Sequence, residues 1–556
     1  MDKKLKDLFE EYWEYRMEVS PGYATFTGRD EYNDRLEDMS REAHEKEVKW
    51  TREFLEKLAD VSVSELSEED LLSHEILVDQ LEHGLEFESH PTYLLPLNQM
   101  MGVHLGFLQL ARVHPFRNLR DFQDFDSRLR AHGKQLEHCL NYLQEGLERN
   151  YTLPEITVKL VCGQLENMVK LDVQDCQHLQ TALQSAKDLD SDCQDYTVKL
   201  EDSYTQTVLP QLKQIHQFLT GEYREGCRKE VGLCHLENGL DLYRLYVKNH
   251  TGLSEEPKEI HQRGLDEVAR IHSQMKDLQS RLDIEGSLQD FFESMRSRSD
   301  LHYSNREEIV THHQDLLKEM AKKLPEYFHT LPKNPYEVHP LPAYQEKEAP
   351  DAFYMPGEPS SNRPGVYYVN TYEPQTRARF NAEVLAYHEA IPGHHLQISI
   401  AQELKDIPEF RKRSSETAYV EGWALYTEKL SHEMGFYEDL HSQFGKLSFE
   451  LWRAARLVVD TGLHALSWTR EKAIDYMNEN TGLSKANIEV EVDRYIAYPG
   501  QALSYKIGEI YLLNLRREAE EKLQDEFSIQ DFHEEVLRHG ALPLPRLGEI
   551  VRKQLL

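Results

Sequence analysis

Apolar residues recur three or four positions apart along most of the first 330 residues. This spacing places them on one face of a helix, and such stripes are found in residues 40–60, 64–84, 255–280 and 306–323. The second stripe opens with Ser-Glu-Leu-Ser-Glu-Glu-Asp, a pattern typical of a helix start. The stripes are too short for a long coiled coil. We therefore predict that residues 1–330 form a body of packed helices.

The pattern changes near residue 331. Eight of the 22 prolines fall between Pro332 and Pro364, and this density of proline excludes a regular helix. Residues 352–355 and 365–371 are rich in β-branched and aromatic side chains between prolines and glycines, which predicts short strands. We therefore predict a mainly α fold with a small β-sheet. Its second part, 331–556, contains a Pro-rich strand segment over 331–372 and helices over 376–508, and is integrated with the helical body.

Candidate chemistry is concentrated in one stretch, His388-Glu389-Ala-Ile-Pro-Gly-His394-His395. Two imidazoles and one carboxylate are the ligand set of hydrolytic zinc sites, and an adjacent glutamate can act as the general base. The familiar motif is His-Glu-x-x-His, with both histidines on one face of a helix. Here a proline occupies the position of the second histidine. The stretch therefore predicts a zinc site only if the helix is interrupted, or if a later histidine replaces the missing one.

Helical geometry leaves two ways to complete the histidine pair. In an unbroken helix His395 points within about 20° of His388, but it lies about 10 Å further along the axis. His394 would point about 120° away, yet a bulge of two residues at Ile391-Pro392 would return it to the position of a normal second ligand. We prefer His394 as the ligand and keep His395 as the alternative.

We predict that the histidine stretch belongs to one helix over 376–406 that is interrupted once, at the Pro-Gly pair. A third ligand is expected from the next helix, whose start is signalled at Ser414. Glu421 lies there among apolar neighbours, and a carboxylate buried without a partner is costly. A metal would supply that partner, although an arginine or exposure to solvent would also explain the residue. Glu428, two turns later on the same face, is a candidate to orient a metal ligand by a hydrogen bond.

Composition narrows the range of functions. The 556 residues include 98 acidic and 64 basic side chains, a net charge of −34, so the phosphates of a nucleic acid would be repelled. No stretch approaches the roughly 18 apolar residues of a membrane span. The first residues also lack the apolar segment of a signal peptide. We therefore expect a cytoplasmic protein that binds neither nucleic acid nor membrane.

Four motifs together resemble the DUF 885 family, whose members are regarded as candidate zinc metallopeptidases. The motifs are His-Glu-Ala-Ile-Pro-Gly-His-His-Leu-Gln (388–397), Tyr-Val-Glu-Gly-Trp-Ala-Leu-Tyr (419–426), Arg-Leu-Val-Val-Asp-Thr-Gly-Leu-His (456–464) and Asp-Arg-Tyr-Ile-Ala-Tyr-Pro-Gly-Gln-Ala-Leu-Ser-Tyr-Lys-Ile-Gly (493–508). The resemblance covers most of the chain. The family is similar to the gluzincins, which include thimet-oligopeptidase-like and Taq-carboxypeptidase-like enzymes.

The resemblance implies a mostly helical body around a deep channel, with a short sheet beside a gluzincin-like zinc site. Matched residue by residue, it implies that His388 and His394 are the histidine ligands of Zn²⁺ and that Glu421 is the glutamate ligand. It also implies that Glu389 is the general base.

Residues near the C-terminal motifs are candidates for the remaining roles. Hydrolysis needs a donor for the developing oxyanion, and Tyr498 and Tyr505 are candidates for it, with packing as the alternative. His464 follows Asp460 by four positions, so Asp460 could orient its imidazole on one face of a helix. His464 is therefore a further catalytic candidate, although a structural histidine would fit equally well. Arg494 and Gln501 are candidates for substrate binding, because an arginine can hold a carboxylate with two hydrogen bonds.

These residues favour a zinc-dependent hydrolase of peptide or related amide bonds, in which Glu389 activates a zinc-bound water. Short peptides or peptide-like molecules are the expected substrates. The interrupted motif supports a second hypothesis, a non-catalytic binding protein that retains the metallopeptidase scaffold. The presence of Glu389 argues against the second hypothesis, because a structural zinc site needs ligands but no base.

Overall fold

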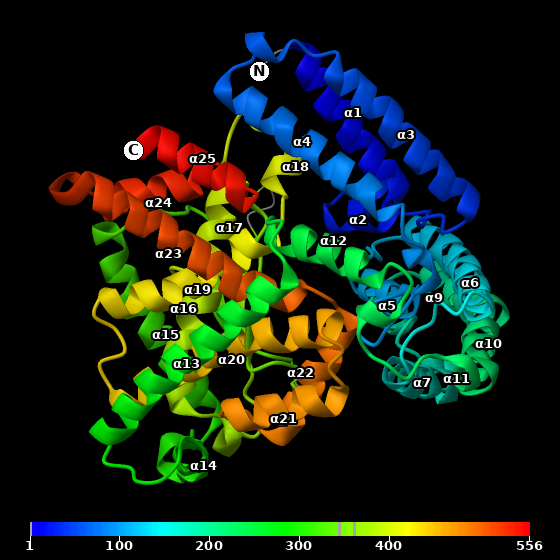
Figure 1. Cartoon of the computed structure of the whole chain (residues 1–556). Coiled ribbons are helices and arrows are strands. Elements are labelled where there is room, and N and C mark those ends of the chain that lie inside the picture. Colours follow the sequence, from blue (N-terminus) through cyan, green and yellow to red (C-terminus); the bar gives the residue numbers. More distant parts are fainter. Residues whose placement is uncertain (1–2, 343–345, 348, 360–362) are drawn as a thin grey trace. The chain divides into compact units, whose positions relative to one another are not determined.

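The computed structural model describes residues 3–342, 346–347, 349–359 and 363–556. Over these residues the chain is mainly helical with one three-stranded sheet, which confirms the predicted fold class (Figure 1). Among the described helices, none combines the length and the apolar character that a membrane span requires.

The helices and strands follow one another along the chain with these bounds: α1 Lys3–Val19, α2 Pro21–Phe26, α3 Arg41–Ala59, α4 Glu68–Phe87, α5 Val103–Val113, α6 Leu119–Glu148, α7 Glu155–Lys170, α8 Gln180–Ala186, α9 Ser191–Ser203, α10 Leu209–Thr220, α11 Glu222–Gly226, α12 Gly239–Thr251, α13 Pro257–Arg281, α14 Leu288–Ser297, α15 Arg306–Lys323, β1 Tyr336–Pro340, β2 Ala352–Met355, β3 Gly365–Val369, α16 Ala382–Glu389, α17 His394–Glu403, α18 Glu409–Lys412, α19 Thr417–Glu433, α20 Leu440–Ala465, α21 Arg470–Asn480, α22 Lys485–Ala497, α23 Ser504–Leu523, α24 Ile529–Leu537 and α25 Leu544–Leu555.

The chain forms two compact units. The first comprises Met1–Leu242 with Ile496–Tyr498, and the second comprises Tyr243–Tyr495 with Pro499–Leu556. The change of composition near residue 330 falls inside the second unit, and the domain boundary predicted there stays a prediction.

Serine side chains cap two of the predicted helices. The side chain of Ser40 accepts a hydrogen bond from the Ala43 amide at the start of α3, and Ser67 does the same for the Asp70 amide at the start of α4. Each bond satisfies an amide that the first helical turn leaves without a partner. The helices predicted over 255–280 and 306–323 are α13 and α15.

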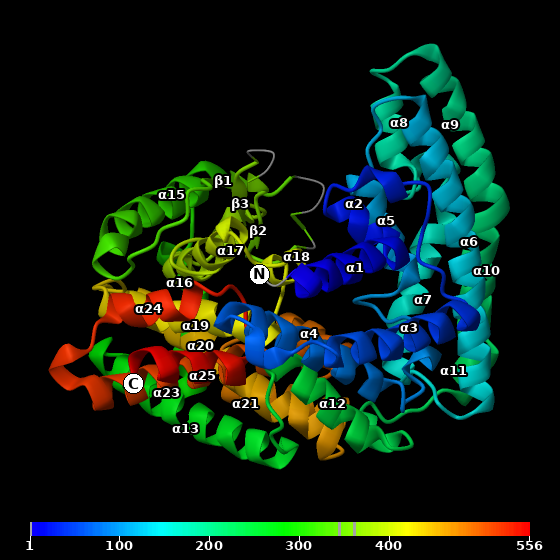
Figure 2. The same cartoon turned by 90° about the horizontal axis from the view of Figure 1, so that it is seen from above.

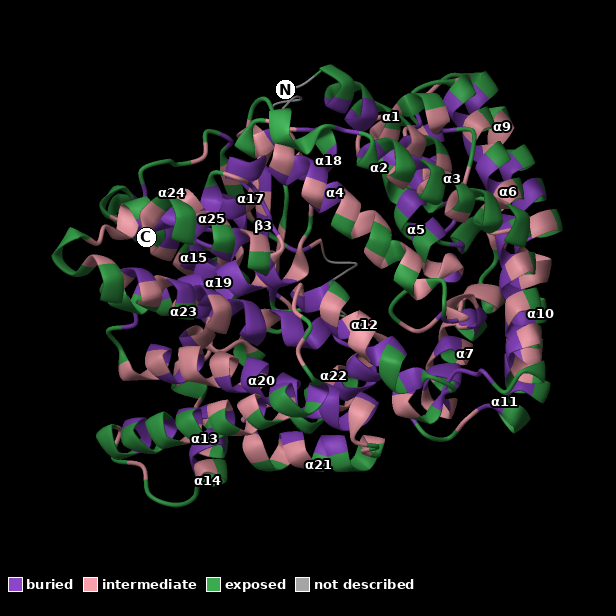
Figure 3. Cartoon of the chain, turned by 45° about the horizontal axis from the view of Figure 1, so that its top comes forward, coloured by how far each residue is buried: buried purple, intermediate pink, exposed green. Residues whose placement is uncertain are grey.

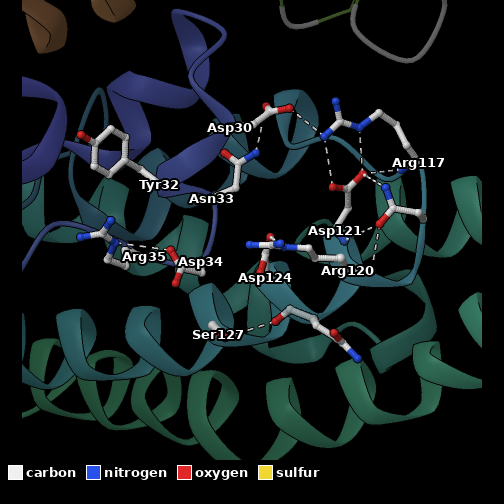
Figure 4. A network of polar contacts seen from close by, with 12 residues as sticks. Asp30, Tyr32, Asn33, Asp34, Arg35, Arg117, Arg120, Asp121, Asp124 and Ser127 are labelled. Carbon is white, nitrogen blue, oxygen red and sulfur yellow. Dashed lines mark hydrogen bonds and ion pairs between the residues drawn. The ribbon is translucent and has the colours of Figure 1, made fainter.

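The first unit is built around α6, a helix of 30 residues. Its buried apolar side chains follow helical spacing and pack against α5, α9 and α10. Polar contacts fix its N-terminal end: Asn118 caps the helix, and Arg117 lies 2.8 Å from Asp30 and 2.9 Å from Asp121 (Figure 4). These partly exposed ion pairs add little stability, but they hold the segment after α2 against α6.

In the second unit, α13 packs along α20 and α19 packs along α23. The second pair approaches closely because glycines meet at the crossing. A Cβ atom on Gly508 would stand 1.9 Å from the carbonyl oxygen of Ala418. Residues of α19 are mostly buried (Figure 3), so this helix crosses the interior of the unit.

The sheet has the strand order β1-β3-β2, with β1 parallel and β2 antiparallel to β3. The two predicted strands are confirmed as β2 and β3, whereas β1 lies in the proline-rich segment and was not predicted. β3 is the central strand, so it offers no free edge. α15 contacts β1 and α16 contacts β2, which sets the β2 edge of the sheet beside the end of α16 (Figure 2).

Candidate metal centre

The histidine stretch forms two helices rather than one. α16 ends at Glu389, a tight turn follows, and α17 begins at His394. Only glycine fits at position 393, because a Cβ atom there would lie 1.9 Å from the carbonyl oxygen of His388. The indole of Trp423, fully buried on α19, donates a hydrogen bond of 2.9 Å to the Pro392 carbonyl. The single interrupted helix predicted over 376–406 is therefore wrong: the turn separates two helices and brings their facing ends together.

The two helix ends and α19 bring three predicted ligands together. The rings of His388 and His394 lie 4.7 Å apart, nearly perpendicular. Oε2 of Glu421 lies 3.7 Å from Nε2 of His388 and 3.6 Å from Nε2 of His394. These separations exceed a hydrogen bond, and this oxygen is buried without a hydrogen-bond partner among the described residues.

A metal ion fits this arrangement. Ligands about 2.0–2.1 Å from a tetrahedral zinc stand about 3.3 Å from one another. Oε2 of Glu421 is only slightly farther than this from each of the two imidazole nitrogens. A buried carboxylate oxygen without a partner is costly, and a cation between it and two imidazole nitrogens would satisfy it. The donor set of two nitrogens and one oxygen is also one that zinc accepts. His388, His394 and Glu421 are therefore suited to hold the ion.

A second glutamate fixes the orientation of His388. Oε1 of Glu428, on α19, lies 2.8 Å from Nδ1 of His388. This contact directs the other ring nitrogen, Nε2, toward Glu421. Burial alone would lower the pKa of His388, but its contacts with Glu421 and Glu428 outweigh burial and raise it to about 9. Burial would raise the pKa of Glu421, yet the two nearby imidazoles hold it well below its usual value.

Glu389 lies in the same cluster but has a different partner. One ligand atom each of His388, Glu389 and His394 lie within 4.8 Å of one another. Oε2 of Glu389 accepts a hydrogen bond of 2.9 Å from the backbone amide of Tyr354 on β2. Glu389 is thus attached to the sheet edge, whereas the oxygen of Glu421 faces both imidazoles.

His395 faces the sheet instead of the cluster. Its Nδ1 lies 2.9 Å from the hydroxyl of Tyr354 and 3.3 Å from that of Ser399, and its ring lies 4.7 Å from the ring of Tyr336. Burial lowers its pKa to about 4, so the imidazole is neutral at neutral pH. Of the two alternatives, the structure places His394, and not His395, beside His388 and Glu421.

The predicted substrate-binding residues form a second group. Arg494 donates hydrogen bonds to Gln501 at 2.7 Å and to the hydroxyl of Tyr505 at 3.4 Å, and it lies 3.4 Å from Glu491. Tyr505 is half-buried. The guanidinium of Arg456 lies over its ring at 4.6 Å.

Two buried arginines of α20 connect this group to the metal centre. Arg456 and Arg453 both stack on Trp452, at 4.4 Å and 5.0 Å. Nη2 of Arg453 lies 3.7 Å from Oε1 of Glu428, the carboxylate that supports His388. A continuous row of side chains therefore runs from Tyr505 to His388.

His464 and Tyr498 are placed differently. His464 is fully buried, and its Nε2 lies 2.9 Å from the Tyr495 carbonyl, so it ties α20 to α22. Asp460, predicted as its partner, accepts hydrogen bonds from Tyr243 at 2.6 Å and from the Gly500 amide at 3.0 Å. Tyr498 belongs to the first unit by its contacts, apart from the unit that contains the histidine cluster.

A family model described as "Bacterial protein of unknown function (DUF885)" matches residues 21–551. The chain belongs to the DUF885 family. No curated protein matches it. Among solved structures, the "putative lipoprotein" of Colwellia psychrerythraea is 26% identical with a TM-score of 0.93, over 100% of this chain and 99% of that one.

Two further structures are similar to this DUF885 chain. A "putative lipoprotein of unknown function" from Shewanella oneidensis is 17% identical with a TM-score of 0.78, over 99% of both chains, which shows a shared fold. An M32 carboxypeptidase from Deinococcus radiodurans R1 is 11% identical with a TM-score of 0.43, over 100% of this chain and 96% of that one.

Sequence reasoning missed three residues that shape the site of this DUF885 chain. They are Trp423, which holds the Pro392 carbonyl; Tyr354, whose amide binds Glu389; and Arg453, which lies beside Glu428. Trp423 and Arg453 lie inside recognisable helices, where a buried aromatic or arginine is indistinguishable from ordinary packing. Tyr354 acts through its backbone, which the sequence does not signal.

Proposed function

We propose that this chain is a zinc-dependent hydrolase of peptide or related amide bonds that acts on short peptides or peptide-like molecules. The observation that carries the proposal is the buried oxygen of Glu421, which faces Nε2 of His388 and of His394 and has no hydrogen-bond partner among the described residues. The family supplies the fold but not the activity, because its description assigns none.

His388, His394 and Glu421 would hold the ion, and Glu428 would keep His388 in the tautomer whose Nε2 lone pair faces it. A zinc ion held there supplies Lewis-acid chemistry, polarising a carbonyl and lowering the pKa of water. Of the two glutamates near the histidines, Glu421 suits the ligand role, because the Tyr354 amide already occupies Oε2 of Glu389.

Glu389 suits the role of general base. Its carboxylate lies beside the histidine pair and is anchored at one oxygen, so its position relative to the reacting centre is fixed. It would take a proton from the attacking water and pass it to the leaving amine. Tyr505 would donate a hydrogen bond to the developing oxyanion, and Arg494 with Gln501 would bind a polar group of the substrate.

Two measurements test the proposal: the zinc content of the purified protein and its turnover of an unbiased mixture of short peptides. We expect close to one zinc per chain. We expect Glu389→Gln to keep the zinc and to lose at least about 100-fold in turnover, within the range that general-base catalysis supplies. Glu383→Gln is the matched control on α16, because Gln retains the acceptor for the Tyr437 amide.

A protein without zinc, or a Glu389→Gln variant as active as wild type, would refute the proposal. Zinc bound without turnover of any peptide would instead favour the non-catalytic binding protein, which the absence of a regular His-Glu-x-x-His motif supports.

A further inference from the structure

The second histidine of the His394-His395 pair has no part in the proposed ligand set, yet it is buried and makes specific contacts. Its Nδ1 lies 2.9 Å from the Tyr354 hydroxyl. The same histidine has a hydrogen bond to the backbone of Asn334. A neutral imidazole carries one N–H and one lone pair. If the N–H is used at Asn334, Nδ1 is left to accept from Tyr354.

Tyr354 connects His395 to Glu389. Its side chain reaches His395 on α17, while its backbone amide donates to Oε2 of Glu389 at the end of α16. The ring also crosses to the neighbouring strand, because a Cβ atom on Gly365 would stand 2.3 Å from the Tyr354 hydroxyl. One residue of an edge strand is therefore held at both its side chain and its amide.

We propose that His395 is a positioning residue. Its Nδ1 accepts a hydrogen bond from the Tyr354 hydroxyl, and this contact fixes the position of β2. The Tyr354 amide can then hold Glu389 in the orientation needed for proton transfer. The proposal rests on the proposed function, in which Glu389 is the general base. It explains why two adjacent histidines follow the Pro-Gly turn: the first faces the ligands and the second faces the strand that carries the anchor of the base.

The position of Glu389 matters because a general base must be aligned with the proton that it takes. A general base acts only within hydrogen-bond reach of the proton that it takes, and displacements of about 1 Å can cost about 100-fold in rate. β2 is an edge strand of four residues, paired on one side only. Besides its pairing with β3 and its contacts with α16, the hydrogen bond between Tyr354 and His395 therefore helps to fix the position of this strand.

The test compares three variants with wild type. His395→Leu removes the acceptor, Tyr354→Phe removes only the hydroxyl and keeps the amide, and His395→Asn returns an oxygen near the position of Nδ1. We expect the first two each to lower kcat about tenfold or more, with KM within about twofold and zinc content unchanged. His395→Asn should recover most of the loss. Ile398→Val, a conservative change of a partly exposed residue on the same helix α17, is the matched control and should behave as wild type.

The double variant His395→Leu/Tyr354→Phe decides whether the two residues act together. If His395 acts through Tyr354, the double variant should lose no more than either single variant. Losses that multiply, a His395→Leu variant with wild-type kcat, or a loss of kcat accompanied by loss of zinc would each overturn the proposal.

Amide hydrogen exchange in β2 tests the same contact without any turnover. Exchange at the Tyr354 amide should be about tenfold faster in both single variants than in wild type and in Ile398→Val. The proposed function fails if wild type turns over no peptide, or if its turnover persists in Glu389→Gln. The exchange measurement then still decides whether His395 fixes the Tyr354 amide. Unchanged exchange in His395→Leu overturns the positioning role in either case.

Discussion

Each compact unit buries a group of histidines, and the two groups have different surroundings. In the first unit His104, His132 and His178 are almost fully buried, and the ring centroids of His132 and His178 lie 5.6 Å apart. Phe107 stacks on His132, and Tyr204 lies against His178. Two of the histidines have neutral hydrogen-bond partners, because Gln164 contacts His104 and Gln135 contacts His132. Burial lowers the pKa of His178 to about 3 and that of His132 well below its ordinary value.

In the second unit the histidines are also buried, but carboxylates face them. Glu428 contacts Nδ1 of His388, and Glu421 lies between His388 and His394. These carboxylates reverse the effect of burial, so the pKa of His388 is raised to about 9.

A group of buried histidines does not by itself indicate a metal site. The three imidazoles of the first unit behave as neutral packing groups. In the second unit one carboxylate contacts Nδ1 of His388 and another faces both His388 and His394, which makes a site for a cation. The carboxylates, rather than the number of histidines, distinguish the two groups.

The largest expected effect follows from removing the carboxylate between the histidines. Glu421→Ala should weaken zinc binding well beyond the roughly 10–100-fold that loss of a supporting residue costs, because it removes one of three ligands. Zinc content after dialysis and a competition titration with a chelator measure the effect. His178→Phe, in the histidine group of the first unit, should leave zinc binding unchanged; a loss of zinc in that variant would contradict the comparison.

A smaller loss of zinc affinity is expected from changing Glu428, which contacts Nδ1 of His388. Glu428→Gln keeps a hydrogen-bond acceptor near Nδ1 but removes the negative charge, so we expect zinc affinity to fall about 10–100-fold. The same chelator competition measures it. Glu433→Gln, on the same helix and partly exposed, is the control. An affinity equal to that of wild type would show that Glu428 serves packing alone.

Local patterns predicted the parts of the fold that depend on neighbours in sequence. The helix at 306–323 and the strand at 352–355 follow from periodicity and from β-branched and aromatic composition. The strand β1 was missed because its terminal Pro340 and its exposed residues conceal the alternation that marks a strand.

The candidate site likewise contains residues that the sequence pattern predicted and contacts that it could not predict. His388, Glu389 and His394 stand close in sequence, and Glu421 drew attention as a carboxylate among apolar residues. The contacts that complete the site join distant residues: Tyr354 to Glu389 across 35 positions and Trp423 to Pro392 across 31. No local pattern specifies such partners. Asp460 illustrates the same limit, because four-residue spacing suggested a pairing with His464, while the hydrogen bonds of its carboxylate go to Tyr243 and Gly500.

The smallest expected effect concerns the pH dependence of stability in the histidine group of the first unit. An unfolded histidine has a pKa near 6.5, whereas that of folded His178 is about 3. Between these values the unfolded chain binds a proton that the folded chain does not, so stability is complete above about pH 6.5 and decreases as the pH falls toward 3. At pH 5.5 the loss from this residue is about 1.4 kcal/mol.

His178→Phe removes this contribution, because phenylalanine binds no proton in either state. Each protein is compared with itself at pH 7.5 and 5.5, so that a packing change caused by the substitution cancels. We expect the thermal midpoint of wild type to fall by a few degrees more than that of His178→Phe over this range. His235→Gln, which replaces an exposed imidazole, should respond as wild type does. If His178→Phe and wild type respond equally, the buried histidines of the first unit have partners that keep them protonated, and the contrast with the second unit is lost.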